Sequence, residues 1–175
     1  MPRLLSACLL LLSLSAVAAA ITRPIELGTT ITATKPYGSG SLTWLFFTAY
    51  EATLWIDAPQ WSMSAPFALT LRYRMSFTTD ELVERTLEEM AKVAPATPKE
   101  ALARYAAALT RAFPPVKDGD WITALHVPGK STRFFRNSAP TAEIADPAFA
   151  ERFFAIWLSP QTSEPTLRAS LLRLR

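Results

Sequence analysis

The sequence predicts an α+β domain, a large antiparallel sheet with a layer of helices packed on it. Residues 21–77 and 121–144 are strand-like, since they are rich in β-branched and aromatic residues. Residues 78–113 and 146–172 instead carry apolar residues at helical spacing. Because strands and helices are segregated along the chain, the strands should pair antiparallel and the helices should cover the sheet. The 175 residues contain no internal repeat or linker, which predicts one domain after the N-terminal segment.

Residues 1–20 have the order of a secretory signal peptide. Met1-Pro2-Arg3 is a short basic start, an apolar stretch follows, and Ala18-Ala19-Ala20 offers a small-residue cleavage site. The apolar stretch is shorter than the roughly 20 residues of a membrane span. Cys8 lies inside this stretch and not at its end, which argues against a lipid-attachment site. We therefore expect export of bacterial type, with residues 21–175 as the mature domain and the periplasm as its location.

The first half of the mature chain predicts strands. Residues 29–34 are rich in β-branched side chains, and residues 36–41 form a turn cluster with two glycines. Residues 43–57 then predict one long strand, apolar on both faces and therefore covered on both sides. Residues 67–77 alternate between apolar and polar, which is typical of an antiparallel strand with one buried face.

Capping signals mark the helices that follow. Thr78 and Glu81 have the spacing of a capping box, which should open a helix running to about Val93. Thr97-Pro98-Lys99-Glu100 predicts a second box with proline at the first helical position, and a helix running to about Phe113.

The last part of the chain returns to strands and then to helices. Residues 121–127 and 131–136 predict a hairpin around the turn at residues 128–130, with a short strand near Glu143. Asp146-Pro147 predicts an N-cap followed by a helical proline, and one more helix ends the chain.

Composition excludes several classes of function. The net charge of +3 is spread along the chain without a basic run, so no nucleic-acid partner is expected. One histidine and one cysteine cannot build a structural zinc site or a disulfide, and no metal or other cofactor is expected. Five glycines argue against glycine-rich phosphate loops. His126 has no Asp, Ser or Cys close in sequence with which to form a catalytic triad.

Two regions of the sequence carry a family resemblance. Phe47-Thr48-Ala49-Tyr50-Glu51-Ala52-Thr53-Leu54-Trp55 resembles the long-strand signature of chalcone isomerases and their relatives. The tail segments 143–147, 156–160 and 163–165 resemble the same family. The order of these motifs, over about residues 25–172, is most similar to exported bacterial chalcone-isomerase-like proteins. The resemblance implies an open-faced sandwich, which agrees with the order of the predicted elements.

The resemblance also shows which catalytic groups the chain has and lacks. The isomerase reaction, attack of a phenolate on an enone, needs stabilised oxyanions and an oriented substrate. Thr48 matches the family's strand threonine. The helical tyrosine and asparagine positions fall on Leu82 and Glu89, and the late hydroxyl falls on Ile156. Residues 37–41, just before the long strand, offer no arginine, and Lys35 is nearby but offset. Because losing one oxyanion donor costs ~3 kcal/mol, a site without that cation should have little isomerase activity.

Four side chains are candidate ligand contacts. Thr48 and Tyr50 should share one strand face; an ordinary strand threonine and a core tyrosine are the alternatives. Arg72 and Arg74 share a face of another strand, about 7 Å apart. The resemblance implies that they could bind a carboxylate, as arginine and tyrosine do in the fatty-acid-binding branch of the fold; a solvated strand face is the alternative. Glu51 points away from Tyr50, where it either pairs with an arginine or faces solvent.

Three hypotheses of function follow. The first is a non-catalytic periplasmic protein that binds a small apolar or amphipathic, fatty-acid-like ligand in a cleft between sheet and helices, without stable membrane insertion of the mature chain. The second is an isomerase or lyase that uses Thr48 and Tyr50 on an unknown enone-type substrate. The third is an interaction protein, whose mark would be a large exposed apolar patch.

Overall fold

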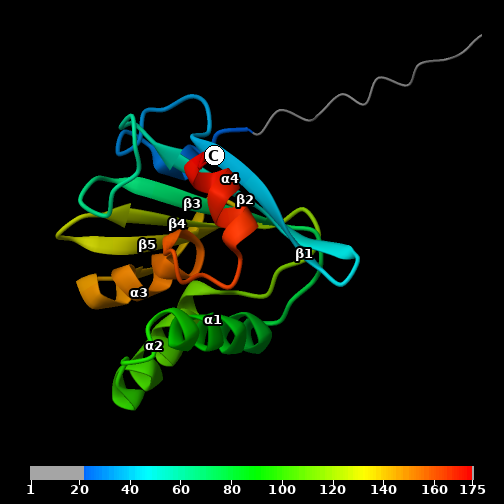
Figure 1. Ribbon diagram of the computed structural model, residues 1–175, viewed down its shortest axis with the longest axis vertical. Helices are drawn as coiled ribbons and strands as arrows, with labels where there is room; N and C mark the ends of the chain where they lie inside the picture. Colours follow the sequence, from blue (N-terminus) through cyan, green and yellow to red (C-terminus); the bar gives the residue numbers. More distant parts are fainter. Residues whose placement is uncertain (1–21, 175) are drawn as a thin grey trace, which may run out of the picture.

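The computed structural model describes residues 22–174 of the chain. Their six strands form an antiparallel sheet in which spatial order follows chain order, β1 to β6. Helices cover one face of this sheet, and the N-terminal segment lies on the other (Figure 1). This arrangement confirms the predicted α+β class with its antiparallel sheet and helical layer. The elements are η1 (Ile25–Leu27), β1 (Gly38–Trp44), β2 (Phe47–Ile56), β3 (Phe67–Tyr73), α1 (Thr79–Val93), α2 (Lys99–Ala112), β4 (Trp121–Val127), β5 (Ser131–Arg136), β6 (Ala139–Ile144), α3 (Pro147–Leu158) and α4 (Pro165–Leu172).

Aromatic rings hold the helical layer on the sheet. On α3, Phe149 and Phe153 stack with their centroids 5.4 Å apart, and Phe153 meets Phe134 of β5 edge-on at 5.3 Å. Phe154 packs against Phe67 of β3 at 4.6 Å. Each such pair adds ~0.5–1.5 kcal/mol beyond the burial of apolar area. The helical spacing of the three α3 rings therefore fixes which side of that helix faces the sheet.

The N-terminal segment covers the opposite face of the sheet. Leu27 and Ile31 are buried against Trp55 of β2, which is itself fully buried. Glu26 adds polar contacts, since its carboxylate accepts hydrogen bonds from Thr123 Oγ1 at 2.6 Å and from other groups of β4 and the β5–β6 turn. The central strands are thus buried on both faces, as the apolar character of β2 predicts.

Residues 43–57 do not form the single long strand that the sequence predicts. They include the end of β1, a tight turn and β2. Leu45 in the turn has φ 56°, a conformation that leucine rarely adopts. Glycine or asparagine would have signalled a turn here, and the sequence has neither. Gly38 and Gly40, predicted in a turn, lie in β1 beneath α4. A Cβ on Gly38 would lie 2.1 Å from the carbonyl oxygen of Leu171, so the close approach of this helix is what requires glycine.

Two other local predictions are wrong. Residues 29–34 form a loop and not a strand. The Asp57 carboxylate organises this loop by accepting a hydrogen bond from the Thr32 backbone N–H at 2.9 Å. Pro98 is the N-cap of α2 and not its first helical residue. Thr97 consequently forms no capping box and donates its hydroxyl to a backbone carbonyl of the preceding turn.

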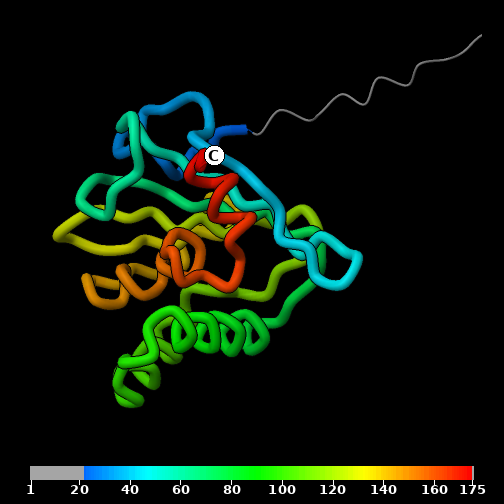
Figure 2. The backbone as a smooth tube through the Cα atoms, viewed as in Figure 1, coloured from blue at the N-terminus to red at the C-terminus, as the bar shows by residue number. Residues whose placement is uncertain are grey.

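Most boundaries set by local signals are confirmed. Thr78 and Glu81 form the predicted capping box of α1. Asp146 caps α3 by accepting a hydrogen bond from the Phe149 backbone N–H at 3.0 Å. The backbone trace also shows the chain ending beside β1, where α4 lies across the sheet edge (Figure 2). The signal peptide predicted for residues 1–20 lies outside the described residues.

Candidate functional site

A cleft of about 410 Å³ opens between the sheet and α1, at the end of the sheet that carries the β1–β2 turn. This volume is within the range of small-molecule sites. Its floor is apolar and comes from four strands and the last turns of α3. The floor includes Leu42, Ala49, Leu69, Leu71, Ile122, Ala124, Phe153, Ile156 and Trp157. Most of its polar groups gather on the α1 side and on the loop before α4, namely Glu81, Arg85, Thr86, Glu89, Ser163 and Glu164, while Thr43, Tyr50 and Tyr73 add hydroxyl groups from the sheet side.

A second depression, of about 320 Å³, lies at the β5–β6 edge of the sheet. It is shallow and open, and it is lined only by residues 133–135 and 140–143. Because the first cleft is larger and more enclosed and combines an apolar floor with a polar network, we place the candidate site there.

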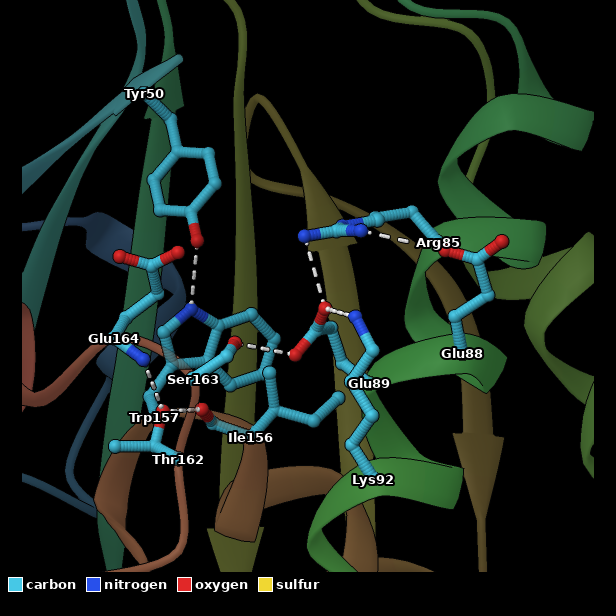
Figure 3. A network of polar contacts seen from close by, with 10 residues as sticks. All are labelled: Tyr50, Arg85, Glu88, Glu89, Lys92, Ile156, Trp157, Thr162, Ser163 and Glu164. Atoms are coloured by element: carbon cyan, nitrogen blue, oxygen red, sulfur yellow. Dashed lines mark hydrogen bonds and ion pairs between the residues drawn. The ribbon is translucent and has the colours of Figure 1, made fainter.

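Glu89 lies at the centre of that network (Figure 3). Its side chain is only 7% exposed, and Oε1 lies 2.9 Å from Nη2 of Arg85 and 2.8 Å from Nζ of Lys92. Its Oε2 accepts a hydrogen bond from Ser163 Oγ at 2.5 Å. Burial alone would raise the pKa of Glu89, but the hydrogen bonds from Lys92 and Ser163 and the charge of Arg85 outweigh it and lower that pKa. The carboxylate therefore stays charged and joins α1 to the loop before α4.

Two tyrosines supply neutral hydroxyl groups to the cleft. The indole N–H of Trp157 donates to the Tyr50 hydroxyl at 2.9 Å, and the ring of Tyr50 meets that of Tyr73 edge-on at 6.0 Å (Figure 3 shows the first contact). Burial raises the pKa of Tyr50 and of Tyr73 well above the usual value. Both side chains thus remain phenols and do not act as bases near neutral pH.

Of the four predicted contact residues, the structure places only Tyr50 on the cleft. The register of β1 and β2 explains why Thr48 lies elsewhere. Leu42 pairs with Tyr50 and Thr43 pairs with Thr48, which leaves Ala49 as an extra residue in a β-bulge. A bulge interrupts the alternation of side chains. As a result Ala49 and Tyr50 both line the cleft, and Thr48 does not share the face of Tyr50.

The two predicted arginines of the β3 region lie outside the cleft lining. Arg74 forms an ion pair with Glu51, with Nη2 at 2.9 Å from one carboxylate oxygen and 3.0 Å from the other. The guanidinium of Arg72 lies 5.7 Å from the ring centre of Trp121. The structure thus selects the pairing alternative for Glu51 and brings neither arginine to Tyr50.

A cation does line the cleft, contrary to the expectation that the site lacks one. Arg85 of α1 lies at the rim, with 58% of its side chain exposed, and pairs with Glu88 and Glu89. A charged residue in mid-helix is typical of a solvated face, so the sequence alone does not mark Arg85 as a cleft residue. The available signal is helical spacing, since Leu82, Thr86 and Glu89 share the same side of α1.

Comparison with known proteins places these features in a family. The family model for chalcone isomerase-like proteins matches residues 34–173. The chain belongs to the chalcone isomerase-like family. The crystal structure of a fatty-acid binding protein from Arabidopsis thaliana is similar to this fold, with a TM-score of 0.58 over 79% of this chain and 86% of that chain. At 10% sequence identity this likeness concerns the fold alone. No protein with a curated description is significantly similar in sequence.

The chalcone isomerase-like cleft offers hydrogen-bonding groups and an apolar floor. The three positions at which the family resemblance places a tyrosine, an asparagine and a late hydroxyl, here Leu82, Glu89 and Ile156, all line it. His126 lies outside the lining, and its Nε2 is 3.0 Å from the Met63 carbonyl oxygen. Within residues 22–174 no group of three His, Cys, Asp or Glu side chains is placed to hold a metal ion. The hydrogen-bonding groups and the apolar floor of the cleft can bind and orient a small molecule.

Proposed function

We propose that this chain is a periplasmic, non-catalytic protein that binds a small apolar or fatty-acid-like molecule in the cleft between the sheet and α1. The observation that carries the proposal is the cleft of about 410 Å³, with an apolar floor and polar groups gathered on one side. Such a division suits an apolar body with one polar end. A fatty-acid binding protein with the same fold supports this class of ligand. The signal-peptide pattern of residues 1–20 supports export.

The polar end of the ligand would lie near Arg85. Its guanidinium holds Glu89 at 2.9 Å but contacts the more exposed Glu88 at 3.3 Å, so a ligand group could replace Glu88 without breaking the inner pair. The Tyr50 hydroxyl accepts from Trp157 and has no other hydrogen bond within residues 22–174, which leaves its proton free for the ligand. These two groups define the expected position of the head.

The apolar body should provide most of the affinity. The positive charges of Arg85 and Lys92 are balanced by Glu88 and Glu89. Glu81 and Glu164 also line the cleft, so it gains little from a carboxylate head. Each buried methylene contributes ~0.8 kcal/mol. Affinity should therefore rise with chain length, and a fatty acid and its matching alcohol should bind within about tenfold of each other.

A binding series tests the proposal. The purified, delipidated protein is titrated with fatty acids and alcohols of increasing length, and binding is followed by thermal shift and calorimetry. Leu82→Trp, on the α1 side of the cleft, should lower affinity at least about tenfold. The matched Leu102→Trp variant changes a partly buried leucine of α2 outside the cleft and should bind as the wild type does. The proposal would be refuted if the protein purifies without bound lipid and no member of the series shifts its melting temperature or gives a binding signal in calorimetry.

The second candidate is an isomerase or lyase acting on an enone-type substrate. The observation that favours it is the presence of Arg85 and of the hydroxyl groups of Tyr50 and Tyr73 on the same cleft. Turnover of chalcone and related enones by the wild type, lost in Tyr50→Phe and in Arg85→Ala, would establish this candidate. Saturable binding without turnover would reject it.

A further inference from the structure

The tip of the β1–β2 hairpin exposes four consecutive large apolar side chains. Trp44, Leu45, Phe46 and Phe47 are 61%, 74%, 93% and 65% exposed. The hairpin projects from the rest of the chain, at the right of both views (Figures 1 and 2). An exposed cluster of this kind marks an interaction surface. It is also the mark expected of the third sequence hypothesis, an interaction protein.

The geometry of the tip indicates what kind of partner it fits. Trp44 and Phe47 pair directly across the hairpin and therefore share one face, and Leu45 and Phe46 form the turn that projects beyond them. The exposed apolar surface thus covers both this face and the end of the hairpin. A groove on a partner protein that covered this face would leave the turn residues Leu45 and Phe46 in water. The boundary between lipid headgroups and acyl chains surrounds an inserted tip on all sides, and tryptophan and phenylalanine are suited to that depth.

We propose that residues 44–47 insert reversibly into the surface of a lipid bilayer. This peripheral contact is separate from a membrane span, because no helix within residues 22–174 is long and apolar enough to cross a bilayer. The contact does not depend on the proposed ligand. Trp44 nevertheless lines the cleft as well, so insertion would bring the mouth of the cleft to the membrane surface, where amphipathic molecules partition.

Charges beside the tip predict how the contact responds to salt. Arg74, whose backbone N–H bonds to the Ala49 carbonyl just beyond the tip, is paired with Glu51 at 2.9 Å and approaches Asp118 at 3.9 Å. This group has no excess of positive charge. Binding should therefore depend on the apolar side chains, be similar on neutral and anionic vesicles, and change little with ionic strength.

Vesicle flotation of ligand-free protein tests the proposal. Phosphatidylcholine vesicles, with and without phosphatidylglycerol, should bind the wild type, and a Leu45→Ser/Phe46→Ser double variant should bind at least about tenfold more weakly. Ile25→Ser is the matched control, because Ile25 is 77% exposed but lies in η1 outside the tip. Brominated lipid should quench Trp44, and Trp44→Phe should remove that part of the quenching while retaining vesicle binding.

Thermal unfolding shows whether the variants fold. Because the substituted tip residues are exposed, we expect the unfolding midpoint to stay unchanged. Absence of vesicle binding by the wild type, or equal binding by the double variant, would overturn the proposal. A dimer in lipid-free solution that the double variant abolishes, combined with no vesicle binding, would assign the tip to a second copy of the chain and would also overturn it. Because no ligand is added, these outcomes are independent of the ligand-binding series.

Discussion

Replacing Glu89 by glutamine should destabilise the protein by about 2 kcal/mol at neutral pH. The hydrogen bond from Ser163 to this charged, nearly buried carboxylate contributes ~1.5–3 kcal/mol. Its partners Arg85 and Lys92 are more than half exposed, so solvent screening reduces each pair to ~0.5 kcal/mol. A glutamine has one acceptor oxygen, which can accept hydrogen bonds from Ser163 or from the two cations but not from all three. Part of the network is therefore lost even though the side chain keeps its shape.

The loss should depend on pH in a defined direction. Burial of Glu89 opposes ionisation, yet the hydrogen bonds from Lys92 and Ser163 and the charge of Arg85 lower its pKa below the ordinary value of 4.5. A carboxyl group with a lowered pKa stabilises the fold above its unfolded pKa, and this contribution disappears as pH falls through the folded pKa. The wild type should thus lose more stability than the variant below about pH 4.5, so that their free energies of unfolding converge in acid.

Urea unfolding at neutral pH and at about pH 3 measures both effects. Glu88→Gln is the control, because Glu88 is the neighbouring residue, is half exposed, and contacts Arg85 at the longer distance of 3.3 Å. It should cost less than ~0.5 kcal/mol. The reasoning is refuted if Glu89→Gln is as stable as the wild type at neutral pH, or if its deficit persists undiminished in acid.

Three further changes test other contacts. Gly38→Ala should destabilise by ~1–3 kcal/mol or more in thermal unfolding, because the new methyl group meets Leu171; an unchanged midpoint would contradict the close approach of α4. Tyr50→Phe should cost ~1–3 kcal/mol in urea unfolding by leaving the Trp157 indole N–H without its acceptor; wild-type stability would contradict this. Glu26→Gln should speed hydrogen exchange in the N-terminal segment about tenfold, since that carboxylate holds the segment on the sheet; unchanged protection would argue against that contact.

The parts of the fold that sequence predicts are those fixed by contacts between residues close together in the chain. Thr78 and Asp146 sit at helix starts because their oxygens accept from backbone N–H groups within three residues, so sequence alone exposes the pattern. Gly38 is required by a long-range contact, with a carbonyl oxygen of α4 more than 130 residues later, so local sequence predicts a turn there instead of a strand. Leu45 adopts a left-handed conformation without a residue that favours it, so no local signal could have divided the long apolar run.

The candidate site was predictable to the same limited extent. Tyr50 was found because the resemblance marks its strand. Thr48 was expected beside it because alternation has a period of two, and the bulge at Ala49 breaks that period through pairing with a different strand. Arg85 is one of several charged residues of α1, and only the packing of that helix over the open end of the sheet selects it. Spacing shows which residues share a side of α1 with Arg85, but which side faces the cleft follows from tertiary contacts.

The pairing of the polar groups favours the proposal that the cleft holds a ligand over the proposal that it transforms one. Arg85 is positioned by two carboxylates, so an oxyanion that developed beside it would compete with Glu88 and Glu89 for the same guanidinium. Electrostatic catalysis needs donors directed at the charge that forms in the transition state, whereas this cation is already neutralised. The Tyr50 hydroxyl keeps a free proton, but most of the surface that still lacks a partner is apolar, on the cleft floor and at Trp44 beside it. Burial of apolar area is therefore the largest free energy that a bound molecule can gain here, which supports the proposal that the cleft binds its ligand without transforming it.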